Sequence, residues 1–170
     1  MKNSMKVLSV ILMAGFLLTF NSCEKVADLV PIPSMTATVD GVEWKSIFRA
    51  SVLFEGNQMM TITGTPEASE NVDKAIILSI YGTAAGTYNL SPGTLVTECL
   101  VAYKKTAGAV DGDDNYYVSH TASITITSID LDKKKISGTF SATLIPTGGG
   151  VDEISITNGK FENLTYQTQP

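Results

Sequence analysis

Apolar and polar residues alternate with a period of two along most of this chain, which is typical of β-strands that bury one face. The clearest example runs from Thr121 to Leu144, where two alternating runs flank a charged hairpin tip. Ile124 lies on the apolar face of the first run and Phe140 on that of the second, while Ile129 falls out of phase and indicates a bulge or the start of the turn. The pattern predicts a long antiparallel hairpin with one buried face and one Ser- and Thr-rich face toward water.

Shorter stretches of the same period predict the other strands. Met35, Ala37 and Val39 alternate before Asp40-Gly41, a pair preferred in two-residue type I′ hairpins, and Val42 and Trp44 resume the apolar face. Ala75 to Tyr81 is almost wholly apolar, which predicts a central strand buried on both faces. The remaining predicted strands follow Ala50, Val52 and Phe54, then Met60, Ile62 and Gly64, then Leu95–Tyr103, Tyr116–Thr127, Lys135–Ile145 and Glu153–Thr157, with an Asn158-Gly159 turn before a last strand through Phe161, Leu164 and Tyr166.

The fold class follows from this series of strands. No apolar i, i+3, i+4 pattern persists for three helical turns, so the pattern predicts no long helix. Short, evenly spaced strands with turn signals are typical of antiparallel sandwiches and closed barrels. We expect an all-β fold, a single antiparallel β-sandwich of about nine strands, with a flattened lipocalin-like β-barrel as the alternative. The length of 170 residues suits one such domain.

The N-terminus departs from the strand pattern. Lys2 and Lys6 precede an apolar run from Val7 to Phe20, shorter than the roughly 20 residues of a membrane-spanning helix and typical of a signal peptide. The run ends in Ser22-Cys23, and a small residue directly before a Cys resembles the lipobox of bacterial lipoproteins. That resemblance implies cleavage before Cys23, a diacylglycerol thioether on its sulfur and an acyl chain on its new amino group. Two or three chains give stable membrane attachment.

Three segments follow from this interpretation. Residues 1–22 form the signal peptide, residues 23–34 the lipidated Cys23 and a tether with Pro31 and Pro33, and residues 35–170 the β-domain. We expect a cell-envelope protein anchored in the outer membrane through the lipid on Cys23, on its periplasmic or its surface face.

Charge and cysteine content restrict the partners and the cross-links. The formal net charge is −5 and becomes more negative when Lys2 and Lys6 leave with the signal peptide. An acidic chain argues against nucleic acid, which is held by clustered Lys and Arg. Once Cys23 carries lipid, Cys99 has no partner for an intrachain disulfide, and its apolar neighbours predict a small buried side chain.

Catalytic chemistry is not predicted. His120 is the single histidine, and Ser119 beside it would point to the opposite face of a strand, so the two do not form a nucleophile and base pair. Glu43, Glu98 and Glu153 are expected on the solvent face. We therefore expect no enzyme activity and no cofactor.

The segment from Asp111 to Asn115 begins like a calcium-binding loop. Asp111, Asp113 and Asn115 place oxygen ligands at the first, third and fifth positions. Tyr116 and Ala122 then stand where the EF-hand loop has Gly and Glu. An ordinary acidic turn is expected, and calcium is the alternative.

Binding residues are less clearly marked. Aromatic residues could form a sugar-stacking platform, although they are equally expected in strands and cores. Tyr116 and Tyr117, as strand neighbours, should lie one outside and one inside. The loops Thr65–Lys74 and Lys104–Asn115 are the places where a site is expected. The aromatic residues considered are Trp44, Tyr81, Tyr88, Tyr103, Tyr116, Tyr117 and Tyr166.

The order of several short motifs is similar to that of a known family. The lipobox is followed by an early Ala37–Lys45 segment, a middle Gly86-Thr87-Tyr88, and a closing series made of Ser123–Thr127, Lys135–Phe140 and Ile156–Phe161. This order resembles a family of small Bacteroidota lipoproteins that carry an all-β domain of unknown function. The resemblance implies an all-β domain on an envelope lipoprotein and brings no catalytic residues with it.

The expected function is therefore a non-catalytic binding or structural module, with a glycan or an envelope protein as candidate partner. The alternative is a lipocalin-like carrier of a small apolar ligand, which needs an apolar cavity of roughly 300 Å³ or more. An envelope hydrolase would need His120 or paired carboxylates in a cleft.

Lipidation of Cys23 is directly testable. Cells that express the wild-type protein should incorporate labelled palmitate into it, whereas the Cys23→Ala variant should carry no label, because the thioether has no other acceptor. An unchanged label in the variant would rule out the anchor.

Overall fold

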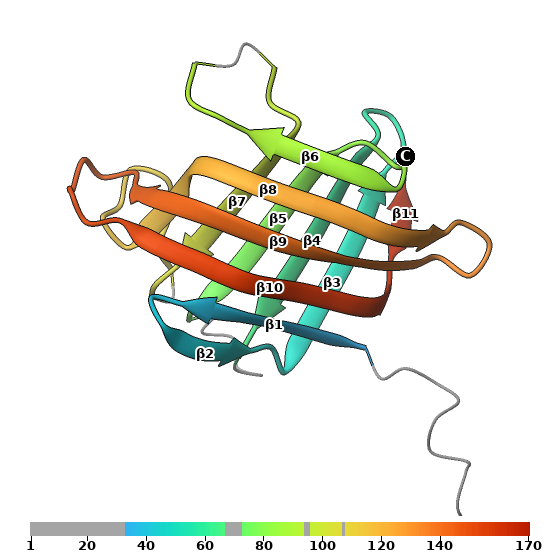
Figure 1. Cartoon of the computed structure of the whole chain (residues 1–170), viewed down its shortest axis with the longest axis horizontal. Helices are drawn as coiled ribbons and strands as arrows, with labels where there is room; N and C mark the ends of the chain where they lie inside the picture. Colours follow the sequence, from blue (N-terminus) through green and yellow to red (C-terminus); the bar gives the residue numbers. More distant parts are fainter. Residues whose placement is uncertain (1–32, 67–72, 94–95, 107) are drawn as a thin grey trace, which may run out of the picture. The chain divides into compact units, whose positions relative to one another are not determined.

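The computed structural model describes residues 33–66, 73–93, 96–106 and 108–170, which form eleven strands and no helix (Figure 1). Cys23 and the predicted signal peptide lie outside the described residues. The strands are β1 (Ser34–Val39), β2 (Val42–Lys45), β3 (Phe48–Phe54), β4 (Met59–Thr65), β5 (Ala75–Tyr81), β6 (Gly86–Leu90), β7 (Cys99–Lys104), β8 (Tyr116–Asp130), β9 (Lys135–Pro146), β10 (Ile154–Thr165) and β11 (Gln167–Gln169).

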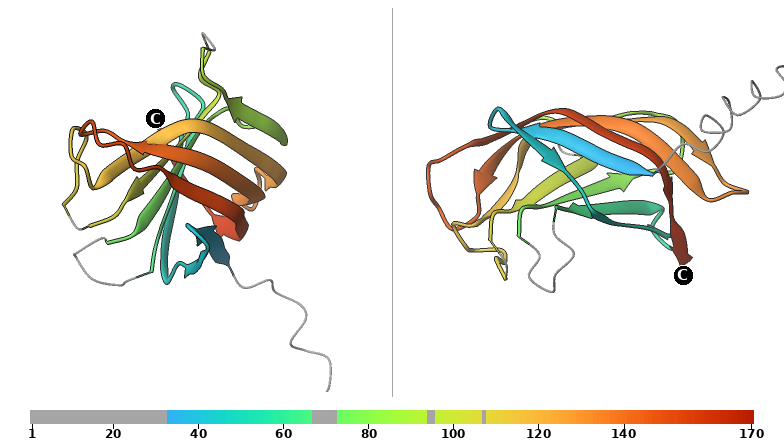
Figure 2. Two further views of the ribbon diagram at one scale, coloured as in Figure 1. Left: turned by 60° about the vertical axis from the view of Figure 1, so that its left-hand side comes forward. Right: turned by 90° about the horizontal axis from the view of Figure 1, so that it is seen from below.

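All eleven strands belong to one sheet, in the order β11-β3-β4-β5-β7-β8-β9-β10-β1-β2, with β6 paired to β8. Figure 1 shows β8, β9, β10 and β1 crossing over β3, β4, β5 and β7, and Figure 2 shows that the described sheet curls into a half-barrel. The predicted all-β fold is confirmed, and the barrel-like alternative is compatible with it. The strands number eleven rather than about nine, and the sheet is mixed because β11 runs parallel to β3.

The strand β8 joins the two layers. Tyr116 to Val118 pair with β7, Ala122 to Ile126 pair with β6, and β9 pairs along almost the whole length of β8. The predicted long hairpin is therefore present. Its predicted irregularity is also confirmed, since the register shifts between Ile126 and Ser128 and lets Ile129 pack against the core. A β-bulge of this kind inserts one unpaired residue and bends the strand.

Apolar side chains from both layers fill the interior. Met35 of β1, Ile62 of β4, Leu78 of β5 and Phe161 of β10 are fully buried. The ring of Phe161 stacks on Phe140 of β9 with centroids 6.4 Å apart. The interior described here is thus a packed core.

The predicted turn at Asn158-Gly159 is wrong. β10 continues from Ile154 to Thr165, and the two residues form a bulge where the register with β9 shifts. Asn158 has a φ of 53°, and a Cβ on Gly159 would collide with the backbone and ring of Phe140. Asn158 therefore supplies the positive φ of the bulge, and Gly159 supplies the space beside Phe140 that a side chain would fill.

The predicted burial is also wrong at several positions. In β3 the buried residues are Ser51 and Leu53, whereas Ala50 is exposed. In β5, Ile77 is only half-buried, because the layer that contains β5 is covered on one face and Ile77 points to the other. By contrast, the Asp40-Gly41 hairpin is confirmed, with φ angles of 48° and 79°.

The opposite faces of β9 give a stability test. Phe140 is 4% exposed and its neighbour Thr139 points to solvent. Phe140→Ala should lower the free energy of unfolding by about 3 to 5 kcal/mol, because it removes the ring and leaves a cavity. Chemical denaturation measures the loss, and Thr139→Ala is the matched control with little expected change. Equal losses in the two variants would contradict the assigned faces.

Candidate functional site

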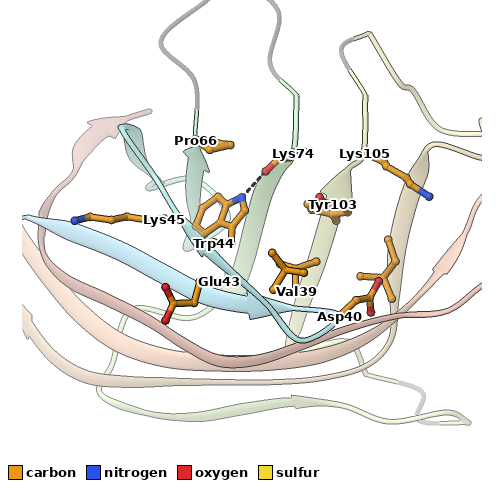
Figure 3. A pocket seen from close by; sticks show the side chains of 11 residues that line it. Val39, Asp40, Glu43, Trp44, Lys45, Pro66, Lys74, Tyr103 and Lys105 are labelled. Carbon is orange, nitrogen blue, oxygen red and sulfur yellow. Dashed lines mark hydrogen bonds between the residues drawn. The ribbon is translucent and has the colours of Figure 1, made fainter.

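A pocket of about 440 Å³ lies where the β1–β2 hairpin meets the ends of β4, β5 and β7 (Figure 3). We call it the Trp44 pocket. Its lining residues are Val39, Asp40, Val42, Glu43, Trp44, Lys45, Pro66, Lys74, Tyr103, Lys105 and Ile154.

The tight hairpin positions Trp44. The Asp40-Gly41 turn sends β2 back along β1 and pairs Trp44 with Ala37. The indole is 6% exposed, and its Nε1–H donates to the Lys74 carbonyl oxygen at 2.7 Å. Gly64 of β4 leaves room for this ring, since an added Cβ would lie 2.9 Å from Trp44 Cη2. The indole therefore ties the hairpin to the start of β5.

Tyr103 comes from β7 and forms the rest of the aromatic lining. Its side chain is 6% exposed. Burial raises the pKa of the Tyr103 phenol above its usual value, and the negative charges of Asp40 and Asp73 raise it further. The phenol is therefore neutral at physiological pH. Together with Val39 and Ile154 it makes a largely apolar floor.

Charged groups of both signs surround this floor. Asp40 Oδ1 accepts a hydrogen bond from the Ser155 N–H at 2.8 Å, which holds the hairpin turn against β10. In Figure 3 the side chains of Glu43 and Lys45 point away from the indole, as expected for neighbours along a strand. Lys105 Nζ lies 5.9 Å from the centre of the Tyr117 ring. An apolar floor with a few polar groups is typical of a ligand-binding pocket.

His120 and Ser119 do not form a catalytic pair. His120 is exposed on β8 and does not line the Trp44 pocket. The Ser119 hydroxyl accepts a hydrogen bond from the Val101 N–H at 3.0 Å. His120 is thus an exposed strand residue apart from the pocket.

The Asp111–Asn115 segment forms an ordinary turn. Asp113 Oδ1 accepts from the Asn115 N–H at 2.9 Å, and the Gly112 N–H donates to Thr147 Oγ1 at 2.8 Å. Within the described ranges, no group of three or more His, Cys, Asp or Glu side chains could hold a metal ion. The expected turn is therefore present.

The aromatic residues do not share one platform. Of these seven aromatic residues, all of them described, Trp44 and Tyr103 alone line the Trp44 pocket. Tyr117 is 3% exposed while Tyr116 is partly exposed, so the expected inside and outside pair is confirmed. Tyr166 is buried. The carboxylates of Glu43, Glu98 and Glu153 belong to exposed residues, as predicted.

The sequence predicted part of this pocket and missed the hairpin that forms most of it. Pro66, Lys74 and Lys105 are described residues of the two loops where a site was expected, and they border the pocket. Residues 67–72 and 107 of these loops lie outside the described residues. The β1–β2 hairpin supplies most of the lining and was not singled out. The available signal was the single Trp of the chain, three residues after the Asp40-Gly41 turn.

The chain is an all-β domain with a pocket at one end of its curled sheet. A family model for a domain of unknown function, DUF6252, matches residues 32–165, and the chain therefore belongs to this family. No curated protein and no solved structure matches the chain. None of the residues placed by the structure forms a helix that could span a membrane.

Cys99, the free thiol of β7, is buried as predicted, and its Sγ–H donates to the Tyr88 carbonyl oxygen at 3.3 Å. Burial raises the pKa of this thiol from 9.0 to about 11, and the charge of Glu98 acts in the same direction. The folded protein thus keeps the thiol protonated where the unfolded chain ionises it.

This shift predicts a loss of stability in alkali. The contribution of the Cys99 thiol to the free energy of unfolding is complete below pH 9.0. It is lost as the pH rises through about 11, and the loss is at most about 2 to 3 kcal/mol. Denaturant titrations at pH 8 and pH 10.5 measure it. The Cys99→Ala variant keeps the contributions of the tyrosines to stability. Its free energy of unfolding should therefore fall less between pH 8 and pH 10.5. An equal loss in both proteins would contradict the assignment.

Proposed function

We propose that this protein is a lipid-anchored envelope lipoprotein whose DUF6252 domain is a non-catalytic binding module, with the Trp44 pocket as its binding site. The observation that carries the proposal is the pocket itself: an aromatic and apolar floor set on strands, with charges of both signs around it. Because Trp44 and Tyr103 are held by the sheet, a ligand meets preorganised groups.

The anchor rests on the sequence. The signal peptide pattern and Ser22-Cys23 favour a lipoprotein of the outer membrane, and the motif order resembles that of Bacteroidota lipoproteins. β1 begins at Ser34, so the residues between Cys23 and β1 would act as a tether of at most about 36 Å. Such a tether lets the pocket meet partners beyond the lipid headgroups.

An enclosed apolar carrier is less well supported. Such a carrier needs an apolar cavity inside the sheet, whereas the described interior is occupied by core side chains such as Ile62, Leu78 and Phe161. The Trp44 pocket lies at the end of the sheet, and its lining includes five charged residues. These features favour a ligand with polar groups.

A hydrolytic role is also less well supported. The described residues of the pocket lining include no Ser, Thr, Cys or His that could act as a nucleophile or an imidazole base. Asp40 is engaged with the Ser155 N–H, and Glu43 projects from the opposite face of β2 to Trp44. We therefore assign both carboxylates to binding and structure.

The single Trp of the chain lies in the pocket and reports directly on binding. Glycans and fractions of envelope extract should include a ligand that changes the Trp44 emission of the mature lipidated protein in a saturable way. Val42→Asp should weaken that binding about tenfold or more, because it places a charge in the pocket mouth. Val42 lines the pocket and is 69% exposed, so the fold should tolerate the change.

Val96→Asp is the matched control, because Val96 is equally exposed but does not line the pocket. Its affinity should equal that of the wild type. The proposal fails if both variants bind with unchanged affinity, or if a bound ligand leaves Trp44 emission unaltered.

A further inference from the structure

Among the described residues, none pairs with the outer edge of the strand β2. This strand ends the strand order of the sheet and pairs only with β1. A two-residue turn closes on a hydrogen-bonded pair, so Val39 and Val42 exchange backbone hydrogen bonds, and so do Ala37 and Trp44. The Ser46 N–H, which donates to the Met35 carbonyl oxygen at 2.9 Å, continues the same alternation.

Glu43 and Lys45 therefore direct their N–H and C=O groups away from β1. Among the residues that the structure places, none bonds to these four backbone groups. All four residues of β2 line the Trp44 pocket, so the unpaired edge borders it (Figure 3). Unpaired edges of this kind can accept a further strand.

The side chains along β2 would select what pairs there. Glu43 and Lys45 are exposed and carry opposite charges two residues apart. A paired strand places its side chains directly opposite those of β2, where opposite charges attract and like charges repel. Between these two positions, the residue of the paired strand that lies opposite Trp44 points to the same face as the indole, toward the pocket. Val42 and Ile47, 69% and 66% exposed, add apolar surface at either end of β2.

We propose that β2 receives an extended peptide segment of a partner protein as an added antiparallel strand. The segment has an acidic residue opposite Lys45, an apolar residue opposite Trp44 and a basic residue opposite Glu43. The outer two residues exchange backbone hydrogen bonds with Lys45 and Glu43, and the middle side chain enters the Trp44 pocket near Tyr103. This inference rests on the proposed function, since it names the ligand class of that pocket.

Selective N-methylation of a peptide tests the backbone pairing. The probe is acetyl-Thr-Glu-Leu-Lys-Thr-amide, titrated into the mature lipidated protein in detergent while the emission of Trp44 is followed. Methylating the nitrogens of its Glu and Lys removes both donors that face β2 and should weaken binding about tenfold or more. Methylating the Leu nitrogen, which faces away from β2, should change the affinity less than about threefold.

Protein variants test the charge pattern. Wild type should prefer the probe to its swapped form, acetyl-Thr-Lys-Leu-Glu-Thr-amide, and Glu43→Lys/Lys45→Glu should reverse that preference, each by about tenfold. Glu43→Pro removes an N–H that the β1 pairing does not use, so it should bind the probe more weakly than Glu43→Ala, which loses the same charge.

The outcomes separate this inference from the proposed function. The added strand is overturned if all the N-methylations weaken binding equally. It is also overturned if neither peptide changes the Trp44 emission up to millimolar concentration. If a glycan binds instead and Val42→Asp weakens it, the pocket keeps its proposed role without the peptide. A concentration-dependent dimer that Glu43→Pro abolishes would assign the edge to a second copy of the chain and would also overturn the peptide.

Discussion

The pairing of β7 with β8 holds the two layers of this domain in one sheet. Because β8 is the longest strand, its first residues can pair with β7 while later residues pair with β6, and β9 follows it along almost its whole length. The layers then face each other across a core to which both contribute buried side chains. This arrangement brings the end of β7, with Tyr103, beneath the β1–β2 hairpin.

The candidate site depends on that closure of the sheet. Trp44 is held from two sides, by the hairpin that carries it and by the hydrogen bond from its Nε1–H to the Lys74 carbonyl oxygen. Gly64 provides the space in which the indole lies. In the part of the chain that the structure describes, no strand pairs with the outer edge of β2 beside the pocket. A rigid aromatic floor and this strand edge therefore come from one local structure.

The reliable signals in the sequence were local ones. Strand positions followed from the period of two, and the Asp40-Gly41 turn followed from its residue types. Asn158-Gly159 misled because a bulge and a hairpin both use positive φ. The phase of β3 was misread because small and apolar residues occupy both of its faces. The Trp44 pocket was missed because its lining comes from segments far apart in the chain, from Val39 to Ile154.

By itself, the sequence determined the all-β class, the long β8–β9 hairpin with its bulge, the burial of Cys99 and the family to which the chain belongs. These properties depend on periodicity, turn chemistry and motif order, which are local along the chain. Only the tertiary structure decided the strand order, the parallel pairing of β11 with β3, and the meeting of Trp44, Lys74 and Tyr103. These depend on which strands lie side by side, and a period of two is the same for every arrangement of strands in a sheet.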